Sequence, residues 1–346
     1  MADGVAHLAS IIAAHLREWD TTTAFVEQAI FASEDARTIA AAIDAFCRRH
    51  LGAHVVGGLF NQSSIGSVTG AALSDGRKVV IKTHQPARTR RFVAEIVRIQ
   101  SYLADREMFA PKVLAGPLPL GHGWAVVENY IEIGATADAH RPEIRRALAR
   151  TLRTIITTCA PLVASTSLGS GLLASPGAAL WPTPHSKLFD FEATARGAEW
   201  IDDVARRARE RVVPAGPRVI GHSDWRQEHL RFVGEQPVAA FDWDSLCCQY
   251  EAELLGTVAH AFCADWSRAD HRQAPTLAEA RAFISEYEAA RESPFSAAER
   301  RLCAAAFAYS CAYTARCGHA LGKDERDRVG TFAHLVWTER ENLLAL

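Results

Sequence analysis

The chain has 346 residues, of which 49% are hydrophobic and 23% are charged, and its formal net charge is −2 at pH 7. This composition is typical of a globular protein with a real core, and it excludes a disordered chain. A charge this close to zero provides no basic field, so we expect neither nucleic acid nor a membrane surface as a partner.

The N-terminal segment carries Asp3 and no basic cluster ahead of its apolar residues, which is not the pattern of a secretory signal. No run approaches the roughly 20 apolar residues that a membrane-spanning helix needs. The eight cysteines include no C-x-x-C pair, and disulfide scaffolds are usually short secreted chains. We therefore expect a cytoplasmic protein whose cysteines are mostly reduced and buried.

Residues 1–50 have apolar residues at helical spacing, which predicts helices. Residues 55–83 are rich in β-branched residues and glycine, which is typical of strands, and Ser74-Asp75-Gly76 predicts a hairpin turn between two of them. A helical pattern follows over residues 87–106 and a strand pattern over residues 123–133. These patterns predict a small α/β lobe behind a helical extension.

From residue 141 onward the pattern is mainly helical, with one island of short strands over residues 218–242. The expected helices cover residues 141–163, 199–212, 253–266, 276–291, 296–321 and 324–344. The fold class is therefore α+β, with a larger and mostly helical second lobe. Its expected divisions are the helical extension over 1–50, the small lobe over 51–130 and the helical lobe over 131–346.

The island holds the residues with the clearest chemistry. His222 and Asp224 are followed by His229, and Asp242 and Asp244 come after a second apolar run. A hairpin between these segments would bring Asp224 and Asp242 together, so that one carboxylate can accept a hydroxyl proton while the other holds Mg²⁺. Each motif alone is common by chance and would favour an ordinary surface loop. Their order, and the strand-like runs around each, favour a catalytic site.

The segments GHSDWRQEH and VAAFDWDS resemble the catalytic and metal loops of the aminoglycoside phosphotransferase and choline kinase superfamily. The pattern of those loops is H-G-D-x-x-x-x-N followed by I-D-W-[DE], and the likeness extends from Leu51 to the C-terminus. It implies a protein-kinase-like fold of two lobes. Residues 51–130 would then bind the nucleotide, and residues 131–346 would carry the catalytic and metal loops and the acceptor site.

This resemblance implies that Asp224 is the catalytic base, His222 a loop-positioning residue, Asp242 the principal metal ligand and Asp244 a supporting acid. His229 stands where the pattern has Asn. Mg²⁺ prefers oxygen ligands, whereas imidazole suits softer metals. His229 would therefore ligate Mg²⁺ poorly, donate a hydrogen bond to a phosphate, or leave a second metal to water and neighbouring side chains. A preference for Mn²⁺ would suit a nitrogen ligand.

An independent indication lies upstream, in Val79-Val80-Ile81-Lys82. A kinase needs a lysine on a strand to hold the nucleotide phosphates and a helical glutamate to fix that lysine. Lys82 and Glu95, on the following helix, provide this pair. The plain alternatives are a solubilising lysine on an edge strand and a solvated helix position, and the downstream motifs favour the functional interpretation of Lys82.

Two further segments are candidates by their position. Gly66 and Ser67 lie one strand before the lysine, where a phosphate-covering loop is expected, because glycine lets backbone N–H groups approach phosphate. Any hairpin can contain glycines, so the position of this segment one strand before Lys82 supports a phosphate-covering loop better than its glycine does. Glu128, Asn129 and Tyr130 would form the hinge between the lobes, by resemblance the segment whose backbone binds adenine. A simple strand end is compatible with the same residues.

We therefore expect an enzyme that transfers the γ-phosphate of ATP or GTP, with Mg²⁺, to a hydroxyl group of a small molecule. Residues 241–300 contain eleven Asp or Glu and five Arg or Lys. This excess favours a cationic acceptor such as an aminoglycoside, another amino sugar or an amine, although solvated helix faces explain it equally well. The alternative, motivated by His229, is a catalytically impaired pseudokinase that binds nucleotide. A metallohydrolase built on His222, Asp224 and His229 leaves Lys82 unexplained.

Overall fold

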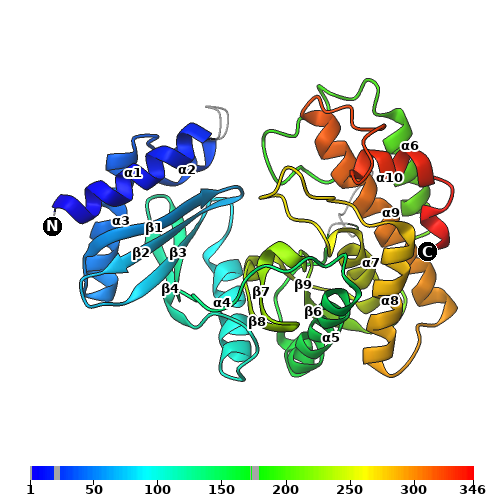
Figure 1. The fold of residues 1–346 in the computed structure, drawn as a ribbon, viewed down its shortest axis with the longest axis horizontal. Coiled ribbons are helices and arrows are strands. Elements are labelled where there is room, and N and C mark those ends of the chain that lie inside the picture. Colours follow the sequence, from blue (N-terminus) through cyan, green and yellow to red (C-terminus); the bar gives the residue numbers. More distant parts are fainter. Residues whose placement is uncertain (1, 19–23, 172, 174–178) are drawn as a thin grey trace. The chain divides into compact units, whose positions relative to one another are not determined.

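The structure is a computed structural model, and it describes residues 2–18, 24–171, 173 and 179–346. The chain forms two compact units, residues 1–132 and residues 133–346 (Figure 1). The first unit combines helices with an antiparallel sheet, and the second is mainly helical with two small sheets. The predicted α+β class is therefore confirmed.

The sheet of the first unit has five antiparallel strands in the order β1-β2-β3-β5-β4. Gly76, with a φ of 86°, closes the turn between β2 and β3, and this conformation is one that glycine adopts without strain. The hairpin predicted at Ser74-Asp75-Gly76 is thus confirmed. The strands are β1 (Val55–Ser63), β2 (Gly66–Leu73), β3 (Lys78–His84), β4 (Val113–Leu120) and β5 (Gly123–Asn129).

Strand β4 is not expected from the sequence, because its residues, VLAGPLPL, include two prolines and a glycine. Proline cannot donate a hydrogen bond to a ladder, so prolines argue against a central strand. β4 lies at the edge of the sheet and pairs only with β5, and an edge strand tolerates the missing N–H groups. The neighbouring β5 ends at Asn129 and a connector follows it, as expected of a strand that leads into a connector over residues 123–133.

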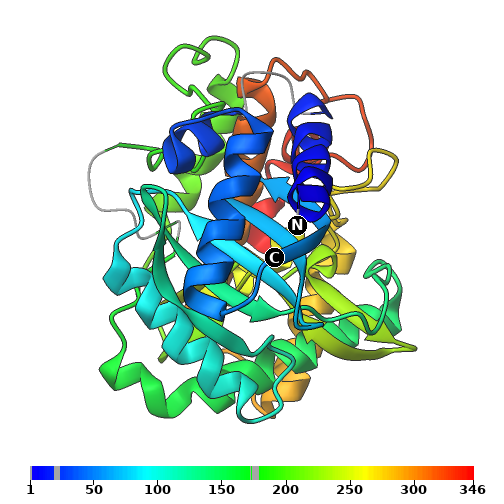
Figure 2. The ribbon, with the colours of Figure 1, turned by 90° about the vertical axis from the view of Figure 1, so that its left-hand side faces the viewer.

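Helices α1 (Ala2–Glu18) and α3 (Ala36–Leu51) lie side by side on one face of this sheet (Figure 2). Apolar residues of both helices share one core with β1, β2, β3 and β5. The short helix α2 (Phe25–Phe31) precedes α3. The N-terminal helices therefore belong to the compact unit that holds the sheet. Residues 1 and 19–23 of the predicted extension lie outside the described part.

The opposite face of the sheet carries Lys82. Val79 and Ile81 on β3 point into the core with α1 and α3, and side chains alternate along a strand, so Lys82 projects to the other side. Helix α4 (Arg90–Ala104) packs along β4 and β5, and its N-cap residue Thr89 accepts a hydrogen bond from the Phe92 N–H at 3.2 Å. The helix predicted over residues 87–106 is confirmed with trimmed ends.

Helix α9 is the centre of the second unit and is buried along most of its length. Helices α6, α7 and α10 pack against it. Capping boxes begin α8 and α9, where Thr276 pairs with Glu279 and Ser296 with Glu299. No helix in the described residues is long and apolar enough to cross a membrane. The helices are α5 (Pro142–Cys159), α6 (Glu199–Glu210), α7 (Glu251–Ala261), α8 (Leu277–Arg291), α9 (Ala297–Ala320) and α10 (Phe332–Glu339).

The prediction of a single helix over residues 324–344 is wrong. Helix α10 covers only Phe332–Glu339, and turns precede it. Gly330 adopts a φ of 87°, a left-handed conformation that ends a right-handed helix. A Cβ at this position would also meet the Arg272 side chain at 2.4 Å. The glycine therefore separates a turn from a short helix.

The island of strands is confirmed and forms two sheets of two strands each, β6 with β9 and β7 with β8. Two short 3₁₀ turns lie between the strands, at Gln227–His229 and at Trp243–Ser245. The strands are β6 (Arg218–His222), β7 (Leu230–Val233), β8 (Gln236–Ala240) and β9 (Leu246–Tyr250).

Candidate active site

Strand pairing in the second unit brings two loops together. His222, the last residue of β6, pairs with Leu246, the first residue of β9. The start of β7 pairs with the end of β8 in the same way. The first loop, residues 223–229, and the second loop, residues 241–245, therefore lie next to each other at one end of both small sheets.

Hydrogen bonds between the two loops hold them in register. The backbone N–H and the hydroxyl of Ser223 both donate to the Ser245 carbonyl oxygen, at 3.0 and 2.8 Å. Nε2 of His222 donates to the Phe241 carbonyl oxygen at 2.9 Å. Each of these bonds joins a residue where β6 meets the first loop to a residue of the second loop. The backbones that carry the candidate residues are thus tied together.

His222 is fully buried. The rings of Trp225 and Trp243 contact it edge-on, at centroid distances of 5.5 and 5.6 Å. Burial lowers the pKa of His222 to about 4, so the ring is neutral near pH 7. A neutral histidine whose proton is committed to a backbone carbonyl is suited to aligning the loops and not to exchanging protons with a substrate.

Asp224 is held from both sides. Its Oδ1 accepts a hydrogen bond from Nη1 of Arg226, and its Oδ2 lies 3.1 Å from Nε2 of His229. Burial alone would raise the pKa of Asp224, but the guanidinium of Arg226 and the contact with His229 outweigh it, so the pKa lies well below its usual range. Arg226 also donates to Glu228 at 3.0 Å. Asp224 is therefore an ionised carboxylate near pH 7.

Asp242 has a φ of 61°, in the left-handed region. Residues other than glycine adopt this conformation at a cost of about 1 kcal/mol or more, and such strain is concentrated at functional sites. The Ser245 hydroxyl donates to Oδ2 of Asp242 at 3.1 Å, and Nε2 of His229 is 3.7 Å from the same oxygen. His229 thus lies between two carboxylates.

Asp224, His229 and Asp242 offer ligand atoms that all lie within 4.8 Å of one another. The two carboxylates suit a hard divalent cation, whereas the imidazole nitrogen does not suit Mg²⁺. Asp244, in the turn after Asp242, is not part of this group. His222 is outside it as well, so the ligand set proposed for a metallohydrolase is not assembled.

In the first unit, Lys82 lies beside a buried carboxylate. Lys82 pairs with Val126 and Val80 pairs with Glu128 across β3 and β5, which makes Lys82 and Glu128 diagonal neighbours on one face. Nζ of Lys82 is 3.8 Å from Oε1 of Glu128. The same oxygen accepts a hydrogen bond from Nε2 of Gln100, on α4, at 2.8 Å. The side chain of Glu128 is therefore a counter-charge for Lys82.

Glu95, the predicted partner of Lys82, lies on α4 as expected. Both of its oxygens accept hydrogen bonds from Arg98, at 3.0 and 2.7 Å. Its side chain is 11% exposed, against 40% for Arg98. Glu95 is therefore not a solvated position on the helix, which was the non-functional interpretation of this residue. The role of Glu95 stays a prediction.

Gly66 and Ser67 begin β2, and the turn before them consists of Ser64 and Ile65. Ser67 is buried and pairs with both neighbouring strands. A Cβ on Gly66 would meet the Thr83 carbonyl oxygen at 2.8 Å, so glycine is needed for close approach of β3. This packing role is sufficient to explain the glycine, and the phosphate-covering role of the segment stays a prediction.

The predicted hinge residues Asn129 and Tyr130 use their backbone N–H groups within the first unit. Asn129 donates to the Lys112 carbonyl at 3.0 Å, and Tyr130 donates to the Lys78 carbonyl at 3.1 Å. The Asn129 side chain also accepts from the Lys112 N–H at 2.6 Å. Adenine binding by this segment stays a prediction.

Three contacts of the candidate site are not found by sequence reasoning: Arg226 with Asp224, Ser245 with Asp242 and the Glu128 carboxylate with Lys82. Arg226 has a local signal, since it stands two residues after Asp224, on a segment where its side chain can reach back. Ser245 stands three residues after Asp242, which is the spacing of a side chain that bonds within one turn. Glu128 has a signal too, because it directly follows the apolar run Ala125-Val126-Val127, and an acid buried at the end of such a run needs a partner.

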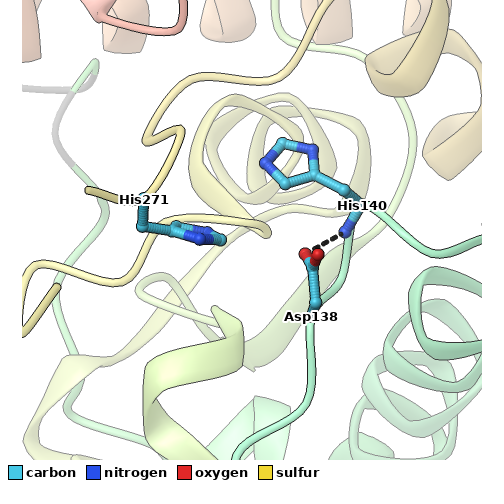
Figure 3. A group of neighbouring side chains, drawn as sticks. All are labelled: Asp138, His140 and His271. Atoms are coloured by element: carbon cyan, nitrogen blue, oxygen red, sulfur yellow. Dashed lines mark hydrogen bonds between the residues drawn. The ribbon is translucent and has the colours of Figure 1, made fainter.

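A second group of metal-type ligands, Asp138, His140 and His271, lies elsewhere in the second unit. Figure 3 shows the His140 ring turned away from the Asp138 carboxylate, which accepts a hydrogen bond from the His140 backbone N–H at 2.9 Å. Nδ1 of His140 contacts Glu279 at 2.9 Å, and the Arg272 guanidinium lies 2.5 Å from the same nitrogen. A guanidinium there opposes a bound cation, so the group is a structural contact.

Several acids of segment 241–300 pair with arginines, and two of these arginines lie outside the segment. Glu251 is 3.0 Å from Arg153 and 3.2 Å from Arg291. Glu286 pairs with Arg145 at 3.0 Å, and the contacts of Glu279 with Arg272 and Glu288 with Arg300 are similar. Arg145 and Arg153 lie outside the segment, which is why counting charges within it overstates its field.

The phosphotransferase enzyme family matches residues 70–298 of the chain. No curated protein gives a significant match. Among solved structures, a macrolide 2′-phosphotransferase from Brachybacterium faecium is 16% identical, with a TM-score of 0.51 and coverage of 84% of this chain and 97% of that one.

Two further structures share the fold. An amicoumacin kinase in complex with AMP-PNP, Ca²⁺ and Ami is 10% identical, with a TM-score of 0.54 and coverage of 83% of this chain and 88% of that one. A spectinomycin phosphotransferase in complex with ADP and spectinomycin is 14% identical, with a TM-score of 0.53 and coverage of 88% and 92%. These likenesses confirm the predicted kinase-like fold.

Proposed function

Because the chain belongs to the phosphotransferase enzyme family, we propose that it transfers the γ-phosphate of ATP or GTP to a hydroxyl group of a small molecule. The observation that carries the proposal is the convergence of Asp224, His229 and Asp242 at two adjoining loops. A lysine on a strand, Lys82, with a buried carboxylate beside it, supports the same function.

Asp224 is the proposed base. Arg226 holds its Oδ1, so Oδ2 is the oxygen that can take a proton. As the hydroxyl oxygen of the acceptor bonds to the γ-phosphorus, the bond from that phosphorus to the β–γ bridging oxygen breaks, the nucleoside diphosphate leaves, and the hydroxyl proton passes to Oδ2. The depressed pKa of Asp224 keeps this oxygen ionised at neutral pH.

Asp242 and Asp244 are the proposed acids on the cation side of the reaction. Carboxylates fit a divalent cation bound with the nucleotide phosphates. The nitrogen of His229 in the same donor group does not fit Mg²⁺, and we assign no step to that ion. The hydrogen bond from Ser245 and the left-handed backbone fix the direction of the Asp242 carboxylate.

Lys82 would bind phosphate oxygens of the nucleotide, with Glu128 and Glu95 as its candidate positioning carboxylates. Gly66 and Ser67 begin the strand after the turn that would cover the phosphates. The hinge segment 128–130 would contact the base. These assignments follow from the position of each residue in the family's fold.

The acceptor that we propose is a hydroxylated amine or amino sugar, the class implied by the resemblance of the two loops. The arginine pairs of segment 241–300 weaken the charge argument for it. A useful panel therefore includes aminoglycosides, amines and neutral hydroxylated antibiotics, each tested with ATP and with GTP.

The test is phosphoryl transfer by the wild type and by Asp224→Asn. We expect loss of a positioned base to lower turnover by about 10²- to 10⁴-fold, while nucleotide binding, followed by thermal shift, stays close to wild type. Asp270→Asn is the matched control, because Asp270 is 84% exposed and lies outside the two loops. Wild-type turnover in the Asp224 variant would contradict the base assignment.

A pseudokinase is the second candidate, and one observation favours it. Both oxygens of Asp224 already contact cationic or hydrogen-bonding partners, Arg226 and His229, which would hinder proton transfer from an acceptor. Such a protein would be stabilised by nucleotide, would transfer phosphate to no acceptor in the panel, and would respond to Asp224→Asn in neither assay.

A further inference from the structure

The β1–β2 hairpin of the first unit carries polar side chains on its core face. Ser63, the last residue of β1, pairs with Ser67 on β2. Ser67 is four residues before Ala71, which lies in the core shared with α1 and α3. Because side chains alternate along a strand, Ser63 and Ser67 lie on this core face, and Lys82 projects from the opposite one. The Ser63 side chain is therefore behind the turn Ser64-Ile65, as seen from the lysine.

Glu27, on helix α2, reaches Ser63 from the core face. The Ser63 hydroxyl donates a hydrogen bond to Oε1 of Glu27. Glu27 is 1% exposed, and burial raises the pKa of its carboxyl, while the bond from Ser63 opposes this change. In the described part of the chain, Oε2 of Glu27 has no hydrogen-bond partner. Burying a carboxyl group with so few partners is costly, so the contact needs an explanation beyond packing.

Helix α2 is anchored to a second turn of the same sheet. The Ile30 carbonyl accepts a hydrogen bond from the His122 N–H at 2.7 Å. A Cβ on Gly121 would meet the same carbonyl oxygen at 2.1 Å, so this approach requires glycine. Strand pairing puts the β4–β5 turn at the same end of the sheet as the turn Ser64-Ile65. The helix therefore gives Glu27 a fixed place behind that end of the sheet.

The turn Ser64-Ile65 has few other anchors. The Ser64 N–H donates to the Gly66 carbonyl at 3.1 Å within the turn itself. Nε2 of Gln85, directly after β3, donates to the Ile65 carbonyl at 2.6 Å. The bond from Ser63 to Glu27 ties the beginning of the turn to a separate element. Its loss should therefore loosen the turn.

We propose that Glu27 is a positioning residue for nucleotide binding, which holds Ser63, and with it the turn Ser64-Ile65, from behind the sheet. The inference rests on the proposed function in one respect, namely that this turn covers the nucleotide phosphates. The sheet lies between Glu27 and a nucleotide bound on the Lys82 face, so Glu27 acts only through the turn. Loss of the bond should weaken nucleotide binding without changing the two loops of the second unit.

Titration calorimetry with the nonhydrolysable analogues AMP-PNP and GMP-PNP measures this affinity without any transfer reaction. We expect Glu27→Gln and Ser63→Ala each to raise the Kd of the analogue that binds about tenfold. The double variant should bind no more weakly than either single variant, because both remove the same bond. Ser63→Thr keeps the hydroxyl and should stay within about twofold of wild type. Amide hydrogen exchange at Ser64 should become faster in Glu27→Gln.

A purely structural role of Glu27 would act through the stability of α2, and a second variant separates the two effects. Ile30→Val removes one carbon from a fully buried residue of the same helix and leaves the bond to Ser63 in place. We expect it to lower the midpoint of urea unfolding while the Kd stays within about twofold of wild type. Glu34→Gln, at an exposed position after α2, is the matched acid-to-amide control and should change neither quantity.

Wild-type affinity in both Glu27→Gln and Ser63→Ala would overturn the inference and leave the proposed function standing. A rise in Kd for Ile30→Val equal to that for Glu27→Gln would overturn it as well. Weaker binding in both bond-breaking variants of a protein that transfers phosphate to no acceptor would support the inference and contradict the proposed function. A wild type that binds neither analogue would overturn both.

Discussion

The two units hold their candidate site residues by different means. Lys82 and Glu128 are on paired strands, and the backbone ladder determines where each side chain projects. Asp224 and Asp242 are in loops beyond the strands, where contacts from other side chains, including His229, hold them. A substitution of Glu128, beside Lys82, should therefore change mainly the local charge. A substitution of a side chain that joins the two loops should displace several side chains of both loops together.

Buried carboxylates give the largest expected contrast between the units. Glu128 accepts a hydrogen bond from Gln100, whereas Oε1 of Glu253, on α7, has no hydrogen-bond partner in the described part of the chain. Burial raises the pKa of Glu253 to about 7, and the charge of Arg218 offsets this only in part. A carboxyl whose folded pKa is raised stabilises the fold below its unfolded pKa, and this contribution is lost as pH rises through the folded value.

We therefore expect Glu253 to lower the free energy of unfolding by up to about 3 kcal/mol between pH 4.5 and pH 8. Glu253→Gln should remove this part of the pH dependence, and urea unfolding of both proteins across that range measures it. Glu210→Gln, on an exposed position of α6, is the control. Parallel stability curves for wild type and Glu253→Gln would show that the carboxyl finds a partner that keeps its pKa normal.

Ser245 tests how far the loops depend on each other. Ser245→Ala removes the hydroxyl that donates to Asp242 at 3.1 Å and leaves the backbone bonds to Ser223 in place. Partners that orient a ligand residue are typically worth about 10- to 100-fold in affinity or activity. We expect a loss in that range for both turnover and the affinity for a divalent cation.

The matched control for this loss is Ser165→Ala, which removes a local bond to the Leu162 carbonyl far along the chain from both loops. Transfer kinetics and the cation titration should leave this variant near wild type. If Ser245→Ala behaves like the control, the left-handed backbone of Asp242 is sufficient to direct its carboxylate.

Elements with a strong local pattern are predictable from the sequence. The alternation of β3 and the Asp-Gly turn place Lys82 on a strand, and capping residues mark the beginnings of α8 and α9. Strand β4 is missed because it is an edge strand with two prolines, and the helix that contains α10 is predicted too long because Gly330, with a positive φ, precedes its true beginning. The order and spacing of the two candidate loops, residues 223–229 and 241–245, are also sufficient to predict that Asp224 and Asp242 lie together.

The contacts of the candidate site are less predictable, because they depend on register between distant segments. The Glu128 carboxylate reaches Lys82 only through the pairing of β3 with β5, which no local pattern specifies. Two of the arginines that pair with the acid-rich segment, Arg145 and Arg153, come from α5, so a count of charges within the segment overstates its net charge. The contacts of His229 are equally hard to predict, because the two carboxylates that it meets, those of Asp224 and Asp242, come from different loops.

The smallest expected effect concerns the partner of Lys82. Glu128→Gln keeps the shape of the side chain and an acceptor for Gln100, but removes the charge 3.8 Å from Nζ of Lys82. Both side chains are largely buried, at 12% and 3% exposure, so solvent screens the charge weakly. Without it the ammonium should be less well positioned, and we expect the KM for nucleotide to rise about tenfold with little change in stability.

Glu132→Gln is a close control, since Glu132 pairs with Lys78 on the same strand at an exposed position. Exposed pairs contribute about 0–1 kcal/mol, and Lys78 is not a site residue, so the KM should stay within about twofold. Glu95→Gln completes the comparison. A KM that rises in Glu95→Gln but not in Glu128→Gln would assign the positioning of Lys82 to the helix. Equal rises in both, with the double variant no worse than either, would mean that the two carboxylates act as one unit on the lysine.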